Sequence, residues 1–218
     1  LVVVPINLGE DDERIEYILK AGNVKLIFVR DEYSDRIKNI INENASLNDI
    51  EAVICSESTD SFIQVEGELS IEEELGEEEA LIVFTSGTTG PPKAVVLSQR
   101  NLLEDARAIS GWHNIGSETR MMCVLPIHHV NGTVVTMITP FFVGGSTVLN
   151  QRFRVEKFFP IVKEENVHIV SVVPTLLQYL NSYYEERDLP EYPSLREIIC
   201  GAGPLTVKVA RTFEARFS

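Results

Sequence analysis

Basic residues are in short supply in this chain. Its 218 residues include 19 lysines and arginines against 33 aspartates and glutamates, which gives a net charge of −14. Because a protein that binds nucleic acid needs a basic face to meet the phosphate backbone, this balance argues against a nucleic-acid partner. Eight glutamates lie between residues 66 and 79, a pattern typical of a solvated connector between folded parts.

Cysteine is also scarce, and no hydrophobic run is long. Cys55, Cys123 and Cys200 share no metal-ligand spacing and lie in or next to apolar runs, so we expect buried, reduced thiols in a cytoplasmic protein and no metal bound by the chain. The longest apolar stretch, 134–145, contains a proline and is too short for a transmembrane segment. Since 44% of the residues are hydrophobic, the chain can nevertheless bury a sizeable core.

The hydrophobic pattern predicts strands and helices that alternate along the chain. Strands are expected at 1–5, 25–29, 50–55, 81–84, 94–97, 121–125, 146–149, 168–173 and 195–200. Helices are expected at 10–21, 33–41, 101–110, 130–143, 155–165 and 206–217, with another that begins at Pro174. This alternation predicts an α/β fold of two mostly parallel sheets with flanking helices and right-handed crossovers. Residues 130–143 are apolar nearly all round and are expected to form a buried helix.

A loop rich in glycine and hydroxyl residues joins the strands expected at 81–84 and 94–97. It contains two prolines and Lys93, preceded by Thr85, Ser86, Gly87, Thr88, Thr89 and Gly90. Glycines let backbone N–H groups approach a ligand closely, and the hydroxyls and the lysine add donors, so the loop is expected to bind phosphate. It differs from the common P-loop because the prolines separate Gly90 from Lys93 and the residues that follow favour a strand. A surface hairpin without a ligand is the alternative.

Two further segments follow predicted strands, where open α/β sheets bind their ligands. Residues 125–132 read Leu-Pro-Ile-His-His-Val-Asn-Gly. Two histidines could bind a metal, but adjacent residues point to different sides and no cysteine or carboxylate joins them, which argues against a metal site. A core or capping histidine is the alternative to a ligand contact. Residues 201–204 read Gly-Ala-Gly-Pro, and such small residues let a planar ring lie against the backbone, although a structural turn would look the same.

The three segments resemble the adenylate-forming superfamily of acyl-CoA synthetases, peptide-synthetase adenylation domains and luciferases. Residues 85–93 resemble its phosphate loop, although the family usually has glycine where this chain has Ala94. Residues 125–132 resemble the pattern of acyl- and aryl-CoA ligases rather than that of peptide-synthetase domains, and residues 201–205 resemble the segment beside adenine. The order and rough spacing of the segments agree with the family, so we expect part of the N-terminal domain of an acyl-CoA synthetase-like fold.

The resemblance implies roles for individual residues. Lys93, Thr85 and His129 are expected to be catalytic, with Lys93 near the β- and γ-phosphates of ATP and His129 beside the carboxylate. The nucleotide is expected to contact Thr85, Ser86, Gly87, Thr88, Thr89, Gly90, Lys93, Gly201, Ala202, Gly203 and Pro204. The acid is expected to contact His129, Val130, Asn131 and Gly132.

The resemblance also implies a function. A member of this family activates a carboxylic acid as an acyl-adenylate, with ATP and Mg²⁺, and transfers it to coenzyme A. The apolar stretch 130–143 and the segment 128–132 favour a fatty or an aryl acid, and we expect a fatty acid. An adenylation domain that loads a carrier-protein thiol is one alternative, and a non-catalytic nucleotide-binding remnant is another. A homodimer is the oligomeric state that we consider.

The expected organisation is that of a partial domain. Residues 1–65 would form a portion of a first α/β subdomain, 66–80 the acidic connector, and 81–218 the phosphate loop with a portion of a second α/β subdomain. The C-terminal domain that carries the catalytic lysine of the family has no counterpart in the chain. We therefore expect these residues to be a fragment that is inactive by itself.

Overall fold

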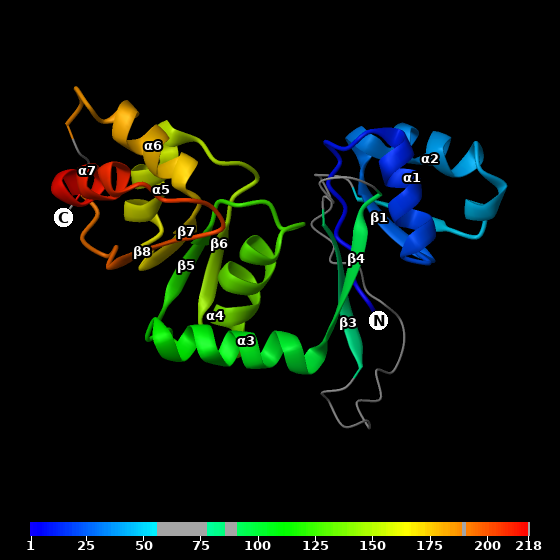
Figure 1. Ribbon diagram of the computed structural model, residues 1–218, viewed down its shortest axis with the longest axis horizontal. Coiled ribbons are helices and arrows are strands. Elements are labelled where there is room, and N and C mark those ends of the chain that lie inside the picture. The colour runs from blue at the N-terminus through cyan, green and yellow to red at the C-terminus, as the bar shows by residue number, and fades with distance from the viewer. Residues whose placement is uncertain (56–77, 86–90, 189–190, 218) are drawn as a thin grey trace. The chain divides into compact units, whose positions relative to one another are not determined.

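The computed structural model describes residues 1–55, 78–85, 91–188 and 191–217 of the chain. The chain divides into two units, Leu1–Gln99 and Arg100–Ser218. Both units contain parallel strands flanked by helices, which confirms the expected α/β fold class (Figure 1). Within the described ranges no helix combines the length and the apolar character needed to cross a membrane.

The first unit begins with a two-stranded parallel sheet and two helices. Its elements in chain order are α1 (Asp12–Ala21), β1 (Leu26–Arg30), the 3₁₀ turn η1 (Asp31–Tyr33), α2 (Ser34–Asn42), the 3₁₀ turn η2 (Ala45–Leu47) and β2 (Glu51–Cys55). The Asp11 side chain caps α1 by accepting a hydrogen bond from the backbone N–H of Arg14 at 2.8 Å. The helices pack their apolar faces on one side of the sheet, with Ile15 and Ile37 fully buried.

The strand expected at 1–5 is reduced to a single bridge, so that prediction was wrong. Val3 donates its N–H to the carbonyl of Ala80 and accepts from the N–H of Ile82, each at 2.9 Å. The next bond of this parallel ladder would need an N–H from Pro5, which proline lacks. The first parallel sheet therefore has two strands, β1 and β2, and the segment around Val3 pairs instead with the strand that contains Leu81.

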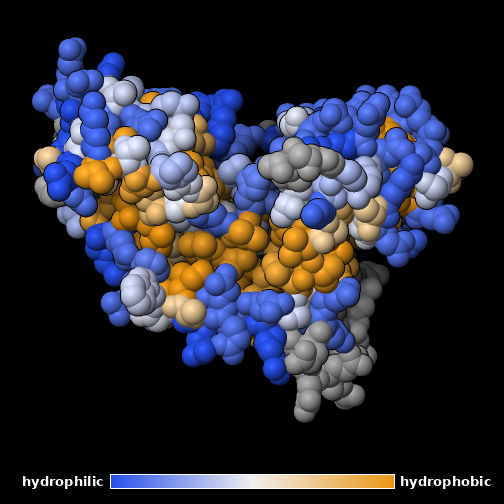
Figure 2. Space-filling view, viewed as in Figure 1, coloured by the Kyte–Doolittle hydropathy of each residue, from blue (hydrophilic) through white to orange (hydrophobic). Residues whose placement is uncertain are grey.

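A β-hairpin completes the first unit. Strands β3 (Glu79–Thr85) and β4 (Lys93–Ser98) pair antiparallel, and apolar atoms show at the surface over both strands (Figure 2). Ala94 pairs with Phe84 in extended backbone and is not among the residues with positive φ, so this position does not require the glycine usual in the family. Glu79 and Ala80, expected in the acidic connector, belong to β3, whereas residues 56–77 lie outside the described residues. The domain boundaries expected from the sequence stay a prediction.

The second unit is built on a four-stranded parallel sheet with strand order β6-β5-β7-β8. The strands are β5 (Arg120–Cys123), β6 (Ser146–Leu149), β7 (Ile169–Val172) and β8 (Glu197–Cys200). The helices are α3 (Gln99–Trp112), the π-helix η3 (Asn131–Ile138), α4 (Thr139–Phe142), the 3₁₀ turn η4 (Val155–Lys157), α5 (Phe158–Glu164), α6 (Pro174–Tyr183) and α7 (Val207–Phe217). The elements expected from the sequence in this unit are all present within a few residues of their predicted bounds.

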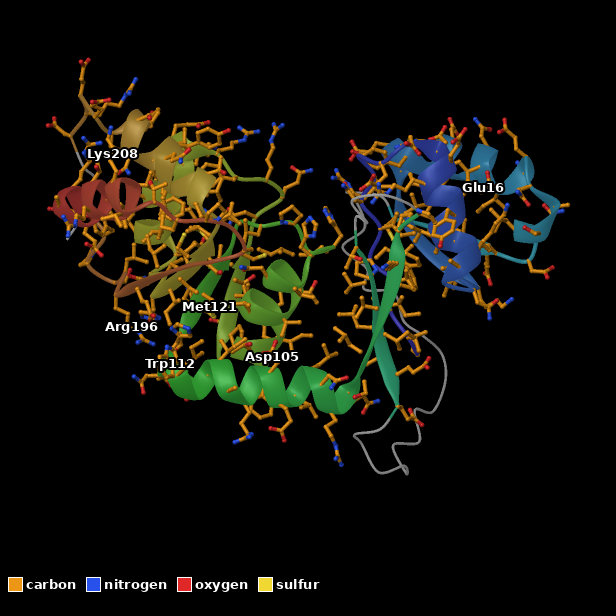
Figure 3. The ribbon with its side chains drawn as sticks, in the orientation of Figure 1. Glu16, Asp105, Trp112, Met121, Arg196 and Lys208 are labelled. Carbon is orange, nitrogen blue, oxygen red and sulfur yellow. The ribbon has the colours of Figure 1, made fainter. Side chains whose placement is uncertain are left out.

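Successive residues of β5 face opposite sides of this sheet. Met122 packs with Phe159 and its neighbours in a core that includes residues of α5, α6 and α7, whereas Met121, labelled in Figure 3, packs with Ile109 of α3 and Val135 of η3. The larger core is aromatic: the ring of Phe159 stacks on that of Tyr192 at 4.6 Å between centroids. Burial there raises the pKa of the Tyr192 hydroxyl above its ordinary value.

The segment expected to be a buried helix at 130–143 is helical but only partly buried. Its first part is the π-helix η3, in which Thr139 donates its backbone N–H to Val134, five residues earlier. Its last turn, α4, leaves Phe141 57% and Phe142 44% exposed, so burial does not extend along the whole segment. Helix α3 likewise continues to Trp112 instead of ending at Gly111, where an added Cβ would meet no atom within 4 Å.

Replacement of Phe159 by alanine should destabilise the second unit by about 3–5 kcal/mol, because it empties a fully buried site in the aromatic core. Urea unfolding followed by circular dichroism measures the loss. Trp112→Ala is the control, since the Trp112 side chain is 84% exposed and its loss should change stability by at most about 0.5 kcal/mol. Equal effects of the two variants would contradict this account of the core.

Candidate functional site

The end of the β3–β4 hairpin brings two of the predicted catalytic residues together. Thr85 is the last residue of β3 and Lys93 the first of β4, and the two are partners in the antiparallel register. The Thr85 hydroxyl donates to the backbone carbonyl of Lys93 at 3.4 Å. Both residues are exposed, so the hydroxyl and the ammonium group can reach a ligand. The other predicted phosphate-loop residues lie outside the described residues: Ser86, Gly87, Thr88, Thr89 and Gly90.

The second unit has a topological switch point at the carboxyl ends of β5 and β7. The chain leaves β5 for β6 on one side and then crosses to β7 on the other side of β5. Loops that follow β5 and β7 therefore diverge, and open α/β sheets bind ligands in the crevice that this leaves. The predicted acid-binding residues follow β5, and the small residues 201–204 follow β8, so all of them lie at the same edge of this sheet.

The loop after β5 presents His129 at the surface. The His129 backbone N–H donates to the carbonyl of Pro126 at 3.1 Å, and its carbonyl accepts from the N–H of Thr133 at 3.0 Å. The side chain is exposed, and its ring lies 4.4 Å from that of His128. In the part of the chain that the structure describes, no three His, Cys, Asp or Glu side chains come together as a metal site would need. The tethered backbone and exposed ring are suited to contact a ligand.

Gly132 lets the chain turn from this loop into η3. A Cβ built at Gly132 would lie 2.4 Å from the carbonyl oxygen of Pro126 and 3.0 Å from that of Leu125. Backbone atoms cannot move away as a flexible side chain can, so only glycine fits here. The Gly132 carbonyl accepts a hydrogen bond at 2.8 Å from the hydroxyl of Thr136, which is fully buried. Gly132 therefore fixes the position of the preceding loop and does not contact a ligand through a side chain.

A buried serine orients Asn131 at the switch point. Ser171, in the middle of β7, is fully buried, and its hydroxyl donates to Oδ1 of Asn131 at 2.8 Å. Because Oδ1 accepts this bond, the amide nitrogen of Asn131 points elsewhere and can donate to a ligand. The sequence reasoning missed Ser171, although a single hydroxyl residue within an otherwise apolar strand is a signal for such a contact.

The loop after β8 lies against the start of α6. The Gly201 N–H donates to the carbonyl of Val172 at 3.2 Å, and a Cβ at Gly203 would be 3.5 Å from the ring of Pro174. Ala202 has a φ of +59°, which costs a non-glycine residue conformational energy and is most common at functional positions. Burial raises the pKa of the neighbouring Cys200 thiol, so this sulfur stays protonated at neutral pH and is a poor nucleophile.

The predicted residues thus form two groups. His129, Val130, Asn131 and Gly132 share a sheet edge with Gly201, Ala202, Gly203 and Pro204, all in the second unit. Thr85 and Lys93 form the other group, in the first unit. The first group provides an imidazole, an amide and a glycine-lined surface, and the second provides a cation and a hydroxyl. These are groups suited to a carboxylate, a planar ring and a phosphate.

Comparisons with known proteins find a matching family model and curated relatives. The family model described as AMP-binding enzyme matches residues 1–218. The chain is 32% identical over 222 residues to sulfoacetate–CoA ligase of Cupriavidus necator, covering 100% of the chain and 42% of that protein. It is 29% identical to oxalate–CoA ligase of Arabidopsis thaliana, covering 97% of the chain and 43% of the relative. The chain thus spans less than half the length of these curated relatives.

Solved structures support the fold. ATP-bound MatB from Rhodopseudomonas palustris aligns with a TM-score of 0.77 at 20% identity, over 99% of this chain and 42% of that one. The inhibitor-bound N-terminal domain of FACL13 from Mycobacterium tuberculosis aligns with a TM-score of 0.79 at 23% identity, over 98% and 54%. At these identities the likeness establishes the fold, which is that of N-terminal domains of acyl-CoA synthetase-like enzymes.

Substitution of Ser171 by alanine tests the role of the switch point. If Asn131 contacts the acid, loss of the orienting hydroxyl should raise the KM for the acid about fivefold, the equivalent of about 1 kcal/mol for one hydrogen bond, and leave kcat nearly unchanged. Steady-state kinetics on the full-length protein measure both constants. Ser182→Ala on the exposed face of α6 is the control. A lower melting temperature with an unchanged KM for the acid would show that Ser171 stabilises the fold but does not orient Asn131 toward the acid.

Proposed function

The chain belongs to the AMP-binding enzyme family, and from this premise we propose that it is part of an ATP-dependent acid–CoA ligase. The observation that carries the proposal is the match of the whole chain to relatives named as CoA ligases. The site supports it, because an imidazole, an amide and a glycine-rich loop lie at the switch point of the second sheet, and a lysine and a threonine lie at the end of the hairpin.

The proposed reaction has two steps. A carboxylate oxygen attacks the α-phosphorus of ATP, the bond to the bridging oxygen breaks, and pyrophosphate leaves with the electron pair to give an acyl-adenylate. The sulfur of coenzyme A then attacks the acyl carbon, loses its proton, and AMP leaves. The first step must bring two anions together, and two unit charges about 4 Å apart repel by about 4 kcal/mol at an effective dielectric of about 20. Cations and oriented donors have to offset this repulsion.

Each predicted residue has a role in this scheme. Lys93 and the hydroxyl of Thr85 would bind the β- and γ-phosphates, together with Ser86, Gly87, Thr88, Thr89 and Gly90 of the loop. His129 and the amide of Asn131 would hold the carboxylate, with Val130 beside it, and the loop from Gly201 to Pro204 would lie against the adenine. Mg²⁺ would accompany ATP as the counter-ion of its phosphates, and we derive no step through it.

The acid itself is the least constrained part of the proposal. The apolar stretch 130–143 favoured a fatty acid, but the exposure of Phe141 and Phe142 weakens that argument. The relatives are named for sulfoacetate, oxalate, malonate and 4-coumarate, which are short or aromatic acids. We therefore place a short carboxylic acid first and keep a fatty acid as the alternative. A panel of acids, assayed by AMP release, separates the two.

Coenzyme A is the proposed acceptor. The relatives are CoA ligases by name, which supports coenzyme A over a carrier-protein thiol, the acceptor in the second hypothesis. Cys55, Cys123 and Cys200 are free thiols, but only Cys123 is buried, so the expectation that all three are buried was wrong for Cys55 and Cys200. A homodimer stays a prediction, as does the cytoplasmic location.

Loss of the Lys93 ammonium should lower kcat/KM for ATP about 100-fold in the full-length protein, the size of effect seen when one preorganised charge-stabilising group is removed. Lys93→Ala tests this in an assay of pyrophosphate release, and Lys93→Arg should recover part of the activity because it restores the charge. Lys38→Ala, at an exposed position of α2, is the matched control. An unchanged kcat/KM in Lys93→Ala would contradict the phosphate-binding role.

The 218-residue chain by itself should show no ATP–pyrophosphate exchange. This expectation follows from the family resemblance, in which adenylate formation needs segments that have no counterpart in this chain. Exchange assays with the isolated chain and with the full-length protein, at equal concentrations and with the same acids, measure the difference. Exchange by the isolated chain at a comparable rate would show that these residues suffice for the first step.

A further inference from the structure

A small cavity opens at the carboxyl end of β6, outside the residues assigned above. It has a volume of about 250 Å³. Its lining includes Met122 and Phe158, which are 0% and 2% exposed and form the inner wall. The lining also includes Arg152, Arg154 and Lys157, which are exposed and lie at the mouth. The cavity is therefore apolar inside and cationic at its entrance.

The cations at this mouth are unusual in so acidic a chain. Arg152, Arg154 and Lys157 lie within six residues, although the chain as a whole carries a net charge of −14. In the part of the chain that the structure describes, none of these three side chains forms an ion pair or a hydrogen bond, and Glu156 in the same run does not pair with them. Three unneutralised cations repel one another, so an anion bound among them would be favoured.

Several other arginines of the chain form ion pairs, although Arg211 forms none within the described residues. Arg36 pairs with Asp12 at 2.7 Å, and Arg107 pairs with Glu104 at 2.7 Å. Carboxylates are abundant enough to neutralise most cations, as the 33 acidic residues indicate. Glu156 lies within the same run, but over the residues that the structure describes no carboxylate pairs with Arg152 or Arg154, so their guanidinium groups are available to a ligand.

The segment that carries these cations is held in place at both ends. Asn150 follows β6, and its backbone N–H and its side-chain amide donate to the carbonyl of Cys123 at 3.1 and 3.3 Å. Further along, the ring of Phe153 lies 6.0 Å from that of Phe158, the first residue of α5. The segment is thus anchored to β5 and to α5. An anchored segment loses less conformational entropy when it binds a ligand than a free one does.

The position of the cavity connects it with the proposed chemistry. Strands β5 and β6 are parallel neighbours, and the cavity lies at their carboxyl ends, the edge of the sheet that carries the His129 loop. A substrate bound at that edge can extend toward the cavity. A guanidinium group offers a planar pair of donors that matches a carboxylate, sulfonate or phosphate group.

We propose that Arg152, Arg154 and Lys157 form a subsite for a second oxyanion group of a substrate, separate from the carboxylate that is activated. Two sources share this chemistry: the distal acid group of a dianionic short acid, and the 3′-phosphate of coenzyme A. The choice between these sources rests on the proposed ligase function, whereas the subsite itself does not. It would favour dianionic over monoanionic substrates of the same size.

Kinetics on the full-length protein test the subsite and identify the source. Arg152→Gln should raise the KM about tenfold, the typical effect of one charge-assisted hydrogen bond. The rise should affect malonate but not propionate if the distal acid group binds there. It should affect coenzyme A but not 3′-dephospho-coenzyme A if the phosphate binds there. Either selective rise supports the proposal. Arg211→Gln is the matched control, because Arg211 also has no partner within the described residues and does not line the cavity.

A binding measurement separates this proposal from the ligase function. Titration with sodium sulfate at constant ionic strength should raise the melting temperature of the wild-type protein and of Arg211→Gln, and this rise should be lost in Arg152→Gln. If no acid is activated by the wild type, the ligase proposal fails and the sulfate result alone decides whether the subsite exists. The subsite is overturned if all KM values respond alike to Arg152→Gln and the sulfate response is the same in the three proteins.

Discussion

Close contact between two backbone segments at Gly132 determines the geometry of the switch point. With 2.4 Å between the carbonyl oxygen of Pro126 and a Cβ built at Gly132, the loop after β5 can enter η3 only through a residue without a side chain. The same contact fixes the loop on which His129 is held between Pro126 and Thr133. Asn131 then lies where Ser171 of the neighbouring strand can bind it. A local steric constraint thereby sets the positions of an imidazole and an amide.

The order of the strands places the loop after β5 at the switch point of the sheet. Because β5 lies between β6 and β7, the chain passes on both sides of it, and the loops at the carboxyl ends diverge around the switch point. The loop after β8 reaches the same edge, where it packs against Pro174 at the start of α6. The π-helix η3 begins directly at this edge, and its wider turn is a form of helix that recurs at functional sites. The switch point and the π-helix η3 thus lie at the same edge of the sheet.

Much of this could be predicted from the sequence, and the exceptions share a cause. Strand β6 and the start of α6 at Pro174 follow from local signals: an apolar run after paired glycines, and a proline at a first helical turn. The small residues 201–204 predict a loop from their composition, and the structure confirms a loop there after β8. Three features depend on residues distant in sequence: the bridge from Val3 to Leu81, the bond from Ser171 to Asn131, and the lack of a partner for Arg152 among the described residues. Hydrophobic periodicity and residue propensity report only on neighbours in the sequence, so they do not predict such contacts.

The strongly acidic composition is compatible with substrates that are themselves anions, because recognition depends on local charge. At physiological ionic strength the Debye length is about 8 Å. Exposed carboxylates that lie farther than this from a bound anion are therefore largely screened from it. The proposed ligand contacts are accordingly cationic: Lys93 at the hairpin end, and Arg152, Arg154 and Lys157 at the cavity. Acidic residues elsewhere pair with some of the other cations, among them Arg36 and Arg107. Each such pair removes one cation that would otherwise compete for an anion, so a local group of cations, such as the three within residues 152–157, favours anion binding in spite of the net negative charge.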